Sequence, residues 1–391
     1  MRRKKSIFPK RALMAFSVLT ISTIGLSSYF LLNKAIKQQT VVVVKTENKK
    51  AIYPVQYSDK HITQNAIVSD DRFRNIAFFN TDNLLANTVS SVKNTGVVGT
   101  TSPERGTWLW TPVLDITPKY RSSIISGAKK EGIKNIYLSI DSYLDIYVMG
   151  DGKEKELRKK EFDQNIVDFI NEAHKNGMTV DAECGWRNWA EKGNEYKAFA
   201  ILQYTINFNK THKEKFRGFQ YDIEPYLLEA YQKDKTKVLK NFVSLINQTV
   251  TKLDKSDLEL SVTIPEFYDG VDNETPVFSF AGKTGLTIDH LLSILDRRAG
   301  SKIIVMSYRN FAKGPNGSID ISVDEINKAN LSKTKVIIAQ ETGDVLPEYI
   351  TFYNKTKTYY RKQVFVLENA FIKDKSFGGT ATHYVNALLE L

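Results

Sequence analysis

The sequence predicts an α/β protein: a (β/α)8 TIM barrel preceded by a single N-terminal transmembrane helix. Eight short apolar runs rich in β-branched residues alternate with polar amphipathic stretches from Trp108 onward. Near-continuous apolar runs are typical of parallel strands buried on both faces. The chain has 391 residues, of which 42% are apolar, so it can bury a large core. An open doubly wound sheet is the alternative, but no glycine-rich phosphate turn follows the first run.

Residues 1–33 are interpreted as a basic cytoplasmic tail and a signal-anchor. The uncharged run at 12–32 has 21 residues, and a helix needs about 20 to cross a bilayer. Cationic side chains before the run favour a cytoplasmic N-terminus, with the rest of the chain outside the cell membrane. A cleaved signal peptide, which would release a secreted protein, is the alternative, although no Ala-x-Ala motif follows. The cationic residues are Arg2, Arg3, Lys4, Lys5, Lys10 and Arg11.

The remainder is expected to divide into a stalk at 34–70 and a barrel domain at 71–391. The formal net charge is +11, but residues 1–60 hold 12 Lys or Arg and only two Asp or Glu. The basic charge therefore lies near the membrane, which argues against a nucleic-acid partner for the folded domain. The single cysteine, Cys184, excludes an intrachain disulfide and is expected to be a buried apolar filler.

Segments with helical periodicity lie between the expected strands. Thr117 before Pro118 predicts a helix start, because proline suits the first helical position. Asp163 is expected to cap a second helix that ends at Gly177. The segment 359–371 could be a strand, but we predict a helix because a strand there would make nine. Further helices are expected at 238–253 and 287–299. The expected strands are 107–110, 135–141, 179–184, 218–224, 258–264, 302–308, 335–341 and 378–384.

Polar side chains, most of them acidic, stand at the ends of the expected strands. In a TIM barrel the active site forms at the carboxyl ends of the strands, so these side chains are expected to meet at one mouth. They are Asp141, Glu183, Asp222, Glu224, Glu266, Tyr308, Arg309, Glu341 and His383.

Asp222 and Glu224 form the sharpest pair. Their i, i+2 spacing places both side chains on the same side of a strand. Two inward carboxyl groups that are partly desolvated should differ in pKa, which gives a protonated acid beside a charged partner. Glycosidic bond cleavage needs such a pair. An ion pair with Arg187 or Arg217 is the purely structural alternative.

The segment 216–224 resembles the fourth-strand signature of family-18 glycoside hydrolases, the chitinases and related endo-N-acetylglucosaminidases. That signature reads Asp-Gly-apolar-Asp-apolar-Asp-apolar-Glu, and Gly218, Phe219, Asp222 and Glu224 match it. Met306-Ser307-Tyr308 is similar to the family's sixth-strand motif, Met-x-Tyr-Asp. The departures are Arg217 and Gln220 in place of two acids, Arg309 in place of the Asp after Tyr308, and no Trp at the end of strand eight.

The resemblance implies roles for three residues. Glu224 would be the general acid/base, Asp222 would orient the acetamido group of the substrate, and Tyr308 would hydrogen-bond that group as its carbonyl oxygen attacks the anomeric carbon. If the acetamido group does not participate, Glu224 would act with Glu341 or Glu183 as the second carboxylate. Their separation would then decide the outcome, with about 5 Å for retention and about 6.5–9.5 Å for inversion.

Further residues near the strand ends are candidates for substrate binding. Trp186 and Trp189 lie in the loop after strand three and suit stacking on sugar faces, with packing on the barrel rim as the alternative. One of Trp108 and Trp110 is expected to face the mouth. No metal or cofactor is expected, because the chain has no Asp-rich loop of the EF-hand type. The full set of substrate-binding candidates is Trp186, Trp189, Glu183, Asp141, Glu341, Tyr221 and His383.

These observations favour a membrane-anchored glycosidase that cleaves a cell-wall or surface polysaccharide containing N-acetylhexosamine. A barrel that binds glycans without cleaving them is a second hypothesis, because Gln220 replaces an acid of the signature. A third is an assembly factor for envelope polymers, which the basic anchor suggests.

Overall fold

The computed structural model describes residues 103–270 and 275–391. The expected transmembrane helix at 12–32 and the stalk at 34–70 lie outside this range. Within it, no helix combines the length and apolar character that a membrane crossing requires.

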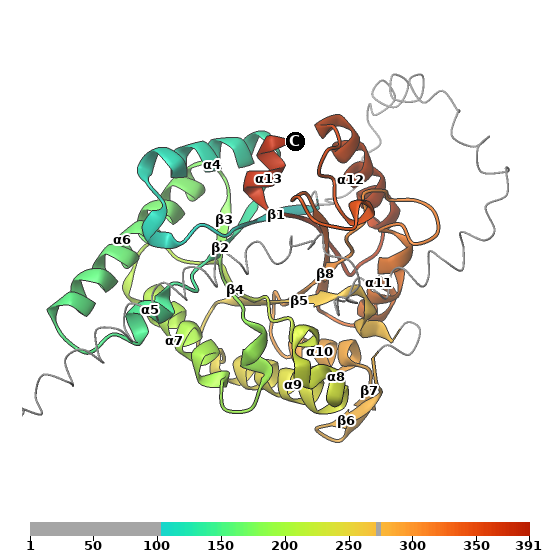
Figure 1. The fold of residues 1–391 in the computed structure, drawn as a ribbon, viewed down its shortest axis with the longest axis horizontal. Helices are drawn as coiled ribbons and strands as arrows, with labels where there is room; N and C mark the ends of the chain where they lie inside the picture. The colour runs from blue at the N-terminus through green and yellow to red at the C-terminus, as the bar shows by residue number, and fades with distance from the viewer. Residues whose placement is uncertain (1–102, 271–274) are drawn as a thin grey trace, which may run out of the picture. The chain divides into compact units, whose positions relative to one another are not determined.

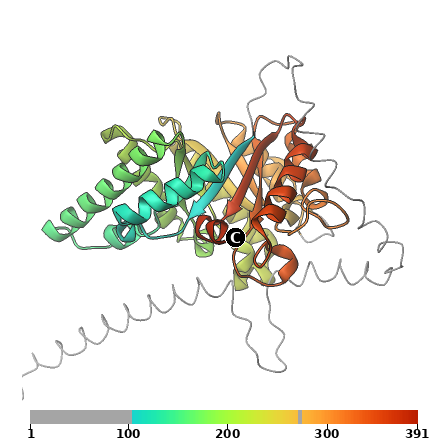
Figure 2. The same ribbon diagram turned by 90° about the horizontal axis from the view of Figure 1, so that it is seen from above.

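Eight parallel strands in the described part of the chain form a closed barrel, as predicted (Figure 1). The first and last strands pair with each other, with Thr107 opposite Thr382, and run side by side in Figure 2. In chain order the barrel strands are β1 (Glu104–Leu109), β2 (Asn135–Ser139), β3 (Thr179–Cys184), β4 (Gly218–Tyr221), β5 (Glu259–Pro265), β8 (Lys302–Met306), β9 (Lys335–Glu341) and β10 (Phe377–His383).

Helices surround the strands (Figure 1). The C-terminal helix packs against α4 and β1, where the barrel closes. A two-stranded antiparallel hairpin, β6 (Phe278–Phe280) with β7 (Lys283–Gly285), contacts α9 and α10. The helices are α4 (Pro118–Lys130), α5 (Tyr143–Tyr147), α6 (Lys153–Lys175), α7 (Glu195–Thr211), α8 (Glu229–Lys233), α9 (Lys235–Lys252), α10 (Thr287–Leu295), α11 (Val323–Ala329), α12 (Lys357–Phe371) and α13 (Val385–Glu390).

The predicted helices are all present, although the helix predicted at 287–299 ends at Leu295. The Thr117 hydroxyl accepts the Tyr120 N–H at 3.3 Å and caps α4, and α12 confirms the helix predicted at 359–371. Asp163, however, does not begin a helix, since α6 starts ten residues earlier, at Lys153. The Asp163 carboxylate instead accepts hydrogen bonds from Lys159 at 2.6 Å and from Tyr204 at 2.7 Å. A highly charged first half concealed the helix, because it contributes little to the apolar face.

Alternate residues of each strand point into the barrel, where six side chains pack as a separate core. Gly106 makes room for the Tyr137 ring, since a Cβ there would lie 2.7 Å from it. The other side of each strand packs against the helices in the larger apolar core. Burial on both faces explains why the strands read as continuous apolar runs. The interior core consists of Trp108, Tyr137, Ile304, Ile337, Ala339 and Ala381.

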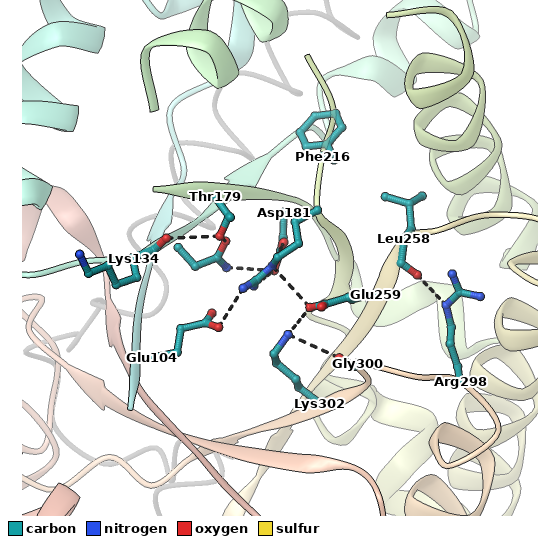
Figure 3. Close-up of polar contacts among 12 residues, drawn as sticks. Glu104, Lys134, Thr179, Asp181, Phe216, Leu258, Glu259, Arg298, Gly300 and Lys302 are labelled. Carbon is teal, nitrogen blue, oxygen red and sulfur yellow. Dashed lines mark hydrogen bonds and ion pairs between the residues drawn. The ribbon is translucent and has the colours of Figure 1, made fainter. Parts of the chain in front are cut away.

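At the amino-terminal end of the barrel, acidic side chains form ion pairs with basic ones (Figure 3). Arg217 binds the buried Asp181 carboxylate through two nitrogens, at 2.7 and 3.0 Å, and reaches Glu104 at 2.8 Å and Glu259 at 3.4 Å. Lys302 also pairs with Glu259. Arg217 therefore precedes β4 at the end opposite the mouth, and the alternative in which it pairs with Asp222 or Glu224 is wrong.

Candidate active site

Asp222 and Glu224 leave β4 at the carboxyl end of the barrel. The Asp222 N–H donates to the Cys184 carbonyl at 3.0 Å, so pairing with β3 continues one residue past the strand. The chain then turns at Pro225 into a 3-10 turn, Pro225–Leu227. Gly185 allows this close approach, because a Cβ there would lie 1.8 Å from the Asp222 carbonyl oxygen. The backbone of two neighbouring strands therefore fixes the position of the acid pair.

Glu224 is an acid whose pKa is raised. Burial raises it most, while a hydrogen bond from the Tyr226 phenol to Glu224 Oε1 lowers it, as do the charges of His383 and Arg187. Among the described residues, no arginine lies within ion-pairing distance of Glu224 or Asp222, so the ion-pair alternative with Arg187 is also wrong. A raised pKa lets Glu224 keep its proton to a higher pH than an ordinary glutamate does, which favours a role as general acid.

Asp222 has the larger shift, with a pKa raised to about 8. Burial is the main cause, the neighbouring Glu224 and Asp141 carboxyl groups add to it, and His383 opposes them. Its Oδ1 is buried and has no hydrogen-bond partner in the described part of the chain. At neutral pH Asp222 is therefore mainly protonated, and its neutral carboxyl group can donate a hydrogen bond.

Two more acids extend this group across β2 and β3. Glu183 is fully buried, and its oxygens make no hydrogen bond of ordinary geometry within the described residues. Burial raises the pKa of Glu183 well above its usual range, Asp141 and Asp222 raise it further, and the nearby Ser139 hydroxyl offsets only part of the rise. Asp141 Oδ1 accepts the Gly185 N–H at 3.3 Å. The ends of β2, β3 and β4 thus form an acid half of the mouth.

The ends of β8, β9, β10 and β1 form the other half, which is mainly aromatic. His383 at the end of β10 binds Glu341 Oε2 through Nδ1 at 2.7 Å, and the Trp110 indole donates to its Nε2 at 2.9 Å. The Gly343 N–H donates to the second Glu341 oxygen at 2.6 Å. Both oxygens of Glu341 are therefore engaged, which makes it a poor second carboxylate for a two-acid mechanism.

Tyr308 follows β8 in the aromatic half and lies close to acids of both halves. Burial raises the pKa of its phenol well above the usual value, and Glu341, Asp222 and Glu224 raise it further in that order, so the phenol stays neutral and lies in the field of all three acids. Arg309, the next residue, is buried, donates to the Tyr308 carbonyl at 2.8 Å and pairs with Glu266 at 3.7 Å. The Tyr308 ring stacks on His383 with centroids 6.1 Å apart.

Two predicted substrate contacts do not reach the mouth. Tyr221 is fully buried on the helix side, where its hydroxyl donates to the Ala198 carbonyl at 3.3 Å. Trp189 is 2% exposed and meets the Tyr221 ring edge-on at 6.4 Å, so packing on the barrel rim is correct for it. Trp186 is partly exposed, with the Arg187 guanidinium 5.6 Å from its ring centroid.

Three residues near the acid pair were missed or only partly anticipated. Tyr226 was not predicted. It lies two residues after Glu224, and the turn that begins at Pro225 brings its hydroxyl into contact with the Glu224 carboxylate. Trp110 was one of two candidates to face the mouth, but its bond to His383 depends on the pairing of β1 with β10, which no local motif reveals. Tyr384 was missed as well, and its ring lies 5.3 Å from that of His383.

No protein-family model matches the chain, and no curated protein sequence matches it either. The solved structures similar to it include family-18 chitinases and other barrel glycosidases. The spore cortex-lytic enzyme SleL of Bacillus megaterium QM B1551 is 13% identical, with 76% of this chain and 75% of that chain covered and a TM-score of 0.45. A family-18 chitinase from Cycas revoluta, in complex with (GlcNAc)3, is 12% identical, with coverages of 73% and 96% and a TM-score of 0.45.

A D-psicose 3-epimerase crystallised with D-fructose is also similar, at 11% identity, coverages of 72% and 84% and a TM-score of 0.41. An epimerase and hydrolases thus occur together among the structural neighbours. One barrel architecture serves many reactions, so the side chains at the mouth determine which reaction a given barrel carries out.

Proposed function

We propose that the barrel is a glycoside hydrolase that cleaves glycans containing N-acetylhexosamine. The observation that carries the proposal is the Asp222 and Glu224 pair, which lies at the carboxyl end of the barrel with both pKa values raised. Such a pair supplies a proton to a leaving group and a second neutral acid beside it. The partly exposed aromatic rings of Trp110 and Tyr308 at the same end suit the apolar face of a sugar.

In this proposal Glu224 protonates the glycosidic oxygen as the bond from that oxygen to the anomeric carbon breaks. The carbonyl oxygen of the substrate acetamido group forms the new bond to the anomeric carbon. Protonated Asp222 and the Tyr308 phenol hydrogen-bond the acetamido group and hold it in place. Glu224, now a carboxylate, then takes a proton from the water that opens the cyclic intermediate. The full engagement of Glu341 and the burial of Glu183 favour this route over one that uses a second enzyme carboxylate.

The test compares wild-type protein with Glu224→Gln on β-1,4-linked N-acetylglucosamine oligosaccharides and on peptidoglycan. Product is measured as new reducing ends and identified by mass spectrometry. Glu229→Gln is the matched control, because Glu229 is exposed on α8 five residues further along. We expect Glu224→Gln to lose at least 100-fold in kcat, as is typical when a general acid is removed, while Glu229→Gln retains full activity. Equal activity of Glu224→Gln and wild type would refute the proposal.

A barrel that binds glycans without cleaving them is the second candidate. Gln220 favours it, because this residue replaces an acid of the chitinase-like signature and donates to Thr263 Oγ1 at 2.7 Å inside the barrel. Binding of the same oligosaccharides by calorimetry, with no reducing ends formed by the wild-type protein, would support this candidate over hydrolysis.

We also propose that the domain works outside the cell, anchored in the membrane by residues 12–32. The basic residues before this uncharged run support that orientation. Protease treatment of intact cells that carry an epitope tag at the C-terminus tests it. Digestion of the tag supports the proposal, and protection of the tag in intact but not in lysed cells would contradict it.

A further inference from the structure

His383 occupies the centre of the aromatic half of the mouth. The rings of Trp108, Trp110, Tyr308 and Tyr384 surround it, with centroids between 5.3 and 6.1 Å from its own. Trp110, Tyr308 and Tyr384 are partly exposed and pack on the interior core of the barrel. The side chain of His383 is 22% exposed. The histidine therefore lies among the rings that cap the interior core rather than in bulk solvent.

The two hydrogen bonds of the ring determine its protonation state. An indole N–H can only donate, so His383 Nε2 accepts from Trp110 and carries no proton. The single ring proton of a neutral imidazole is then on Nδ1, from which it donates to Glu341. A protonated Nε2 would face the Trp110 N–H and break this bond. The bond between Trp110 and His383 thus exists only while His383 is neutral.

Burial and the nearby acids shift the pKa of His383 in opposite directions. Burial lowers the pKa of the imidazole, while Glu341, Asp222 and Glu224 raise it above the usual value. The remaining groups that face it are the phenols of Tyr308 and Tyr384 and the indoles of Trp108 and Trp110. The pKa of His383 is therefore raised overall, with Glu341 as the main cause, and protonation at Nε2 would replace the bond from the Trp110 indole.

We propose that His383 is a positioning residue that fixes Trp110 and Tyr308 as the platform for one sugar ring, directly beside the acid pair. This inference rests on the proposed function and deepens it, because the platform selects a pyranose with an apolar face at the bond to be cleaved. Glu341 holds Nδ1, Nε2 holds the Trp110 indole, and the imidazole face supports the Tyr308 ring. A platform fixed before the sugar arrives avoids the entropy cost of ordering these side chains during binding.

One measurement on the free protein tests the positioning alone. The chain has four tryptophans, so ¹⁵N-labelled protein gives four indole N–H signals, and the signal lost in Trp110→Phe identifies Trp110. We expect His383→Ala to shift this signal while the Trp186 signal stays in place. We expect the wild-type signal to shift as the pH is lowered from alkaline values and His383 becomes protonated, at a higher pH than a free histidine because its pKa is raised. A Trp110 signal that responds to neither change would overturn the positioning role.

Glycan binding tests the consequence. In a Glu224→Gln background, which removes turnover, calorimetry with N-acetylglucosamine tetrasaccharide should show at least tenfold weaker binding for His383→Ala and for Trp110→Ala. The two changes together should cost little more than either alone, since both disrupt one platform. His383→Gln, whose amide can also donate and accept, should recover part of the affinity. Thermal midpoints of all variants show whether each one folds.

The two proposals fail in different ways. If wild-type protein hydrolyses the tetrasaccharide and folded His383→Ala binds it as tightly as the background does, the platform inference is wrong and the proposed function stands. If wild-type protein neither cleaves nor binds any N-acetylhexosamine glycan, the proposed function fails together with the sugar platform. In that case the Trp110 indole signal still decides whether His383 positions the indole.

Discussion

Replacing Asp222 with Asn should stabilise the protein, and the gain should grow with pH. Asp222 has a pKa of about 8 in the folded chain against an ordinary value of 3.8. Between these two values the folded state keeps the proton and the unfolded state has lost it. Stability therefore falls as pH rises through this window. Asparagine has nearly the shape of the protonated acid and does not titrate, so the variant escapes this loss.

The size of the stability difference follows from the slope of the free energy of unfolding against pH. Each pH unit inside the window costs about 1.4 kcal/mol of stability in the wild type. Between pH 5 and pH 7 the variant should therefore gain about 3 kcal/mol relative to wild type. For a domain of this size, about 2 °C of thermal midpoint corresponds to each kcal/mol. The difference in midpoint between Asp222→Asn and wild type should thus widen by about 5 °C over two pH units.

Differential scanning calorimetry of both proteins from pH 4.5 to pH 8.5 measures this difference. Asp151→Asn is the matched control for the substitution itself, because the Asp151 side chain is 98% exposed. A constant offset between Asp222→Asn and wild type over the whole range would show that burial does not hold the proton on Asp222. Asp222 would then be ionised at neutral pH and could not act as a neutral carboxyl group beside Glu224.

Three other substitutions test separate parts of the structure. Arg217→Met should lower the free energy of unfolding by about 3–5 kcal/mol in urea titrations, because it leaves the buried Asp181 carboxylate uncompensated, and adding Asp181→Asn should restore part of the loss. Tyr226→Phe removes a bond that lowers the pKa of Glu224, so the alkaline limb of the pH–activity profile should move to higher pH. Gly185→Ala places a methyl group against backbone and should cost about 3 kcal/mol or more by the same titration.

Local patterns were sufficient to predict the barrel and the acid half of the mouth. Each buried strand shows as an apolar run, and the carboxyl-end rule then brings Asp141, Glu183 and Asp222 together without any long-range information. Successive side chains of a strand point to opposite faces. Because Asp222 points inward, its neighbour Tyr221 must point outward, away from the mouth. Tyr221 therefore cannot contact a substrate at the mouth, and its ring packs in the larger apolar core on the helix side.

The aromatic half depended on contacts that no local pattern contains. His383, Glu341 and Trp110 come from β10, β9 and β1, and the hydrogen bonds among them form only when the barrel closes. The sequence places a histidine, an acid and a tryptophan at three strand ends. It does not reveal that Glu341 bonds to Nδ1 of His383 while the Trp110 indole bonds to Nε2. Trp186 and Trp189 show the same limit, because a loop with two tryptophans does not reveal which ring turns inward.

The acids at the two ends of this barrel differ in whether a basic side chain pairs with them. At the amino-terminal end, Asp181 is matched by the Arg217 guanidinium, and the cluster around it is closed by Lys302 (Figure 3). At the carboxyl end, Glu183 is fully buried and Asp222 is partly buried, yet no cation pairs with either among the described residues, and their pKa values rise instead. Unpaired acids in the folded state reduce stability above their unfolded pKa, so they contribute nothing to holding the barrel together at neutral pH. The acids at the mouth are thus better explained by chemistry on a bound ligand than by the stability of the fold.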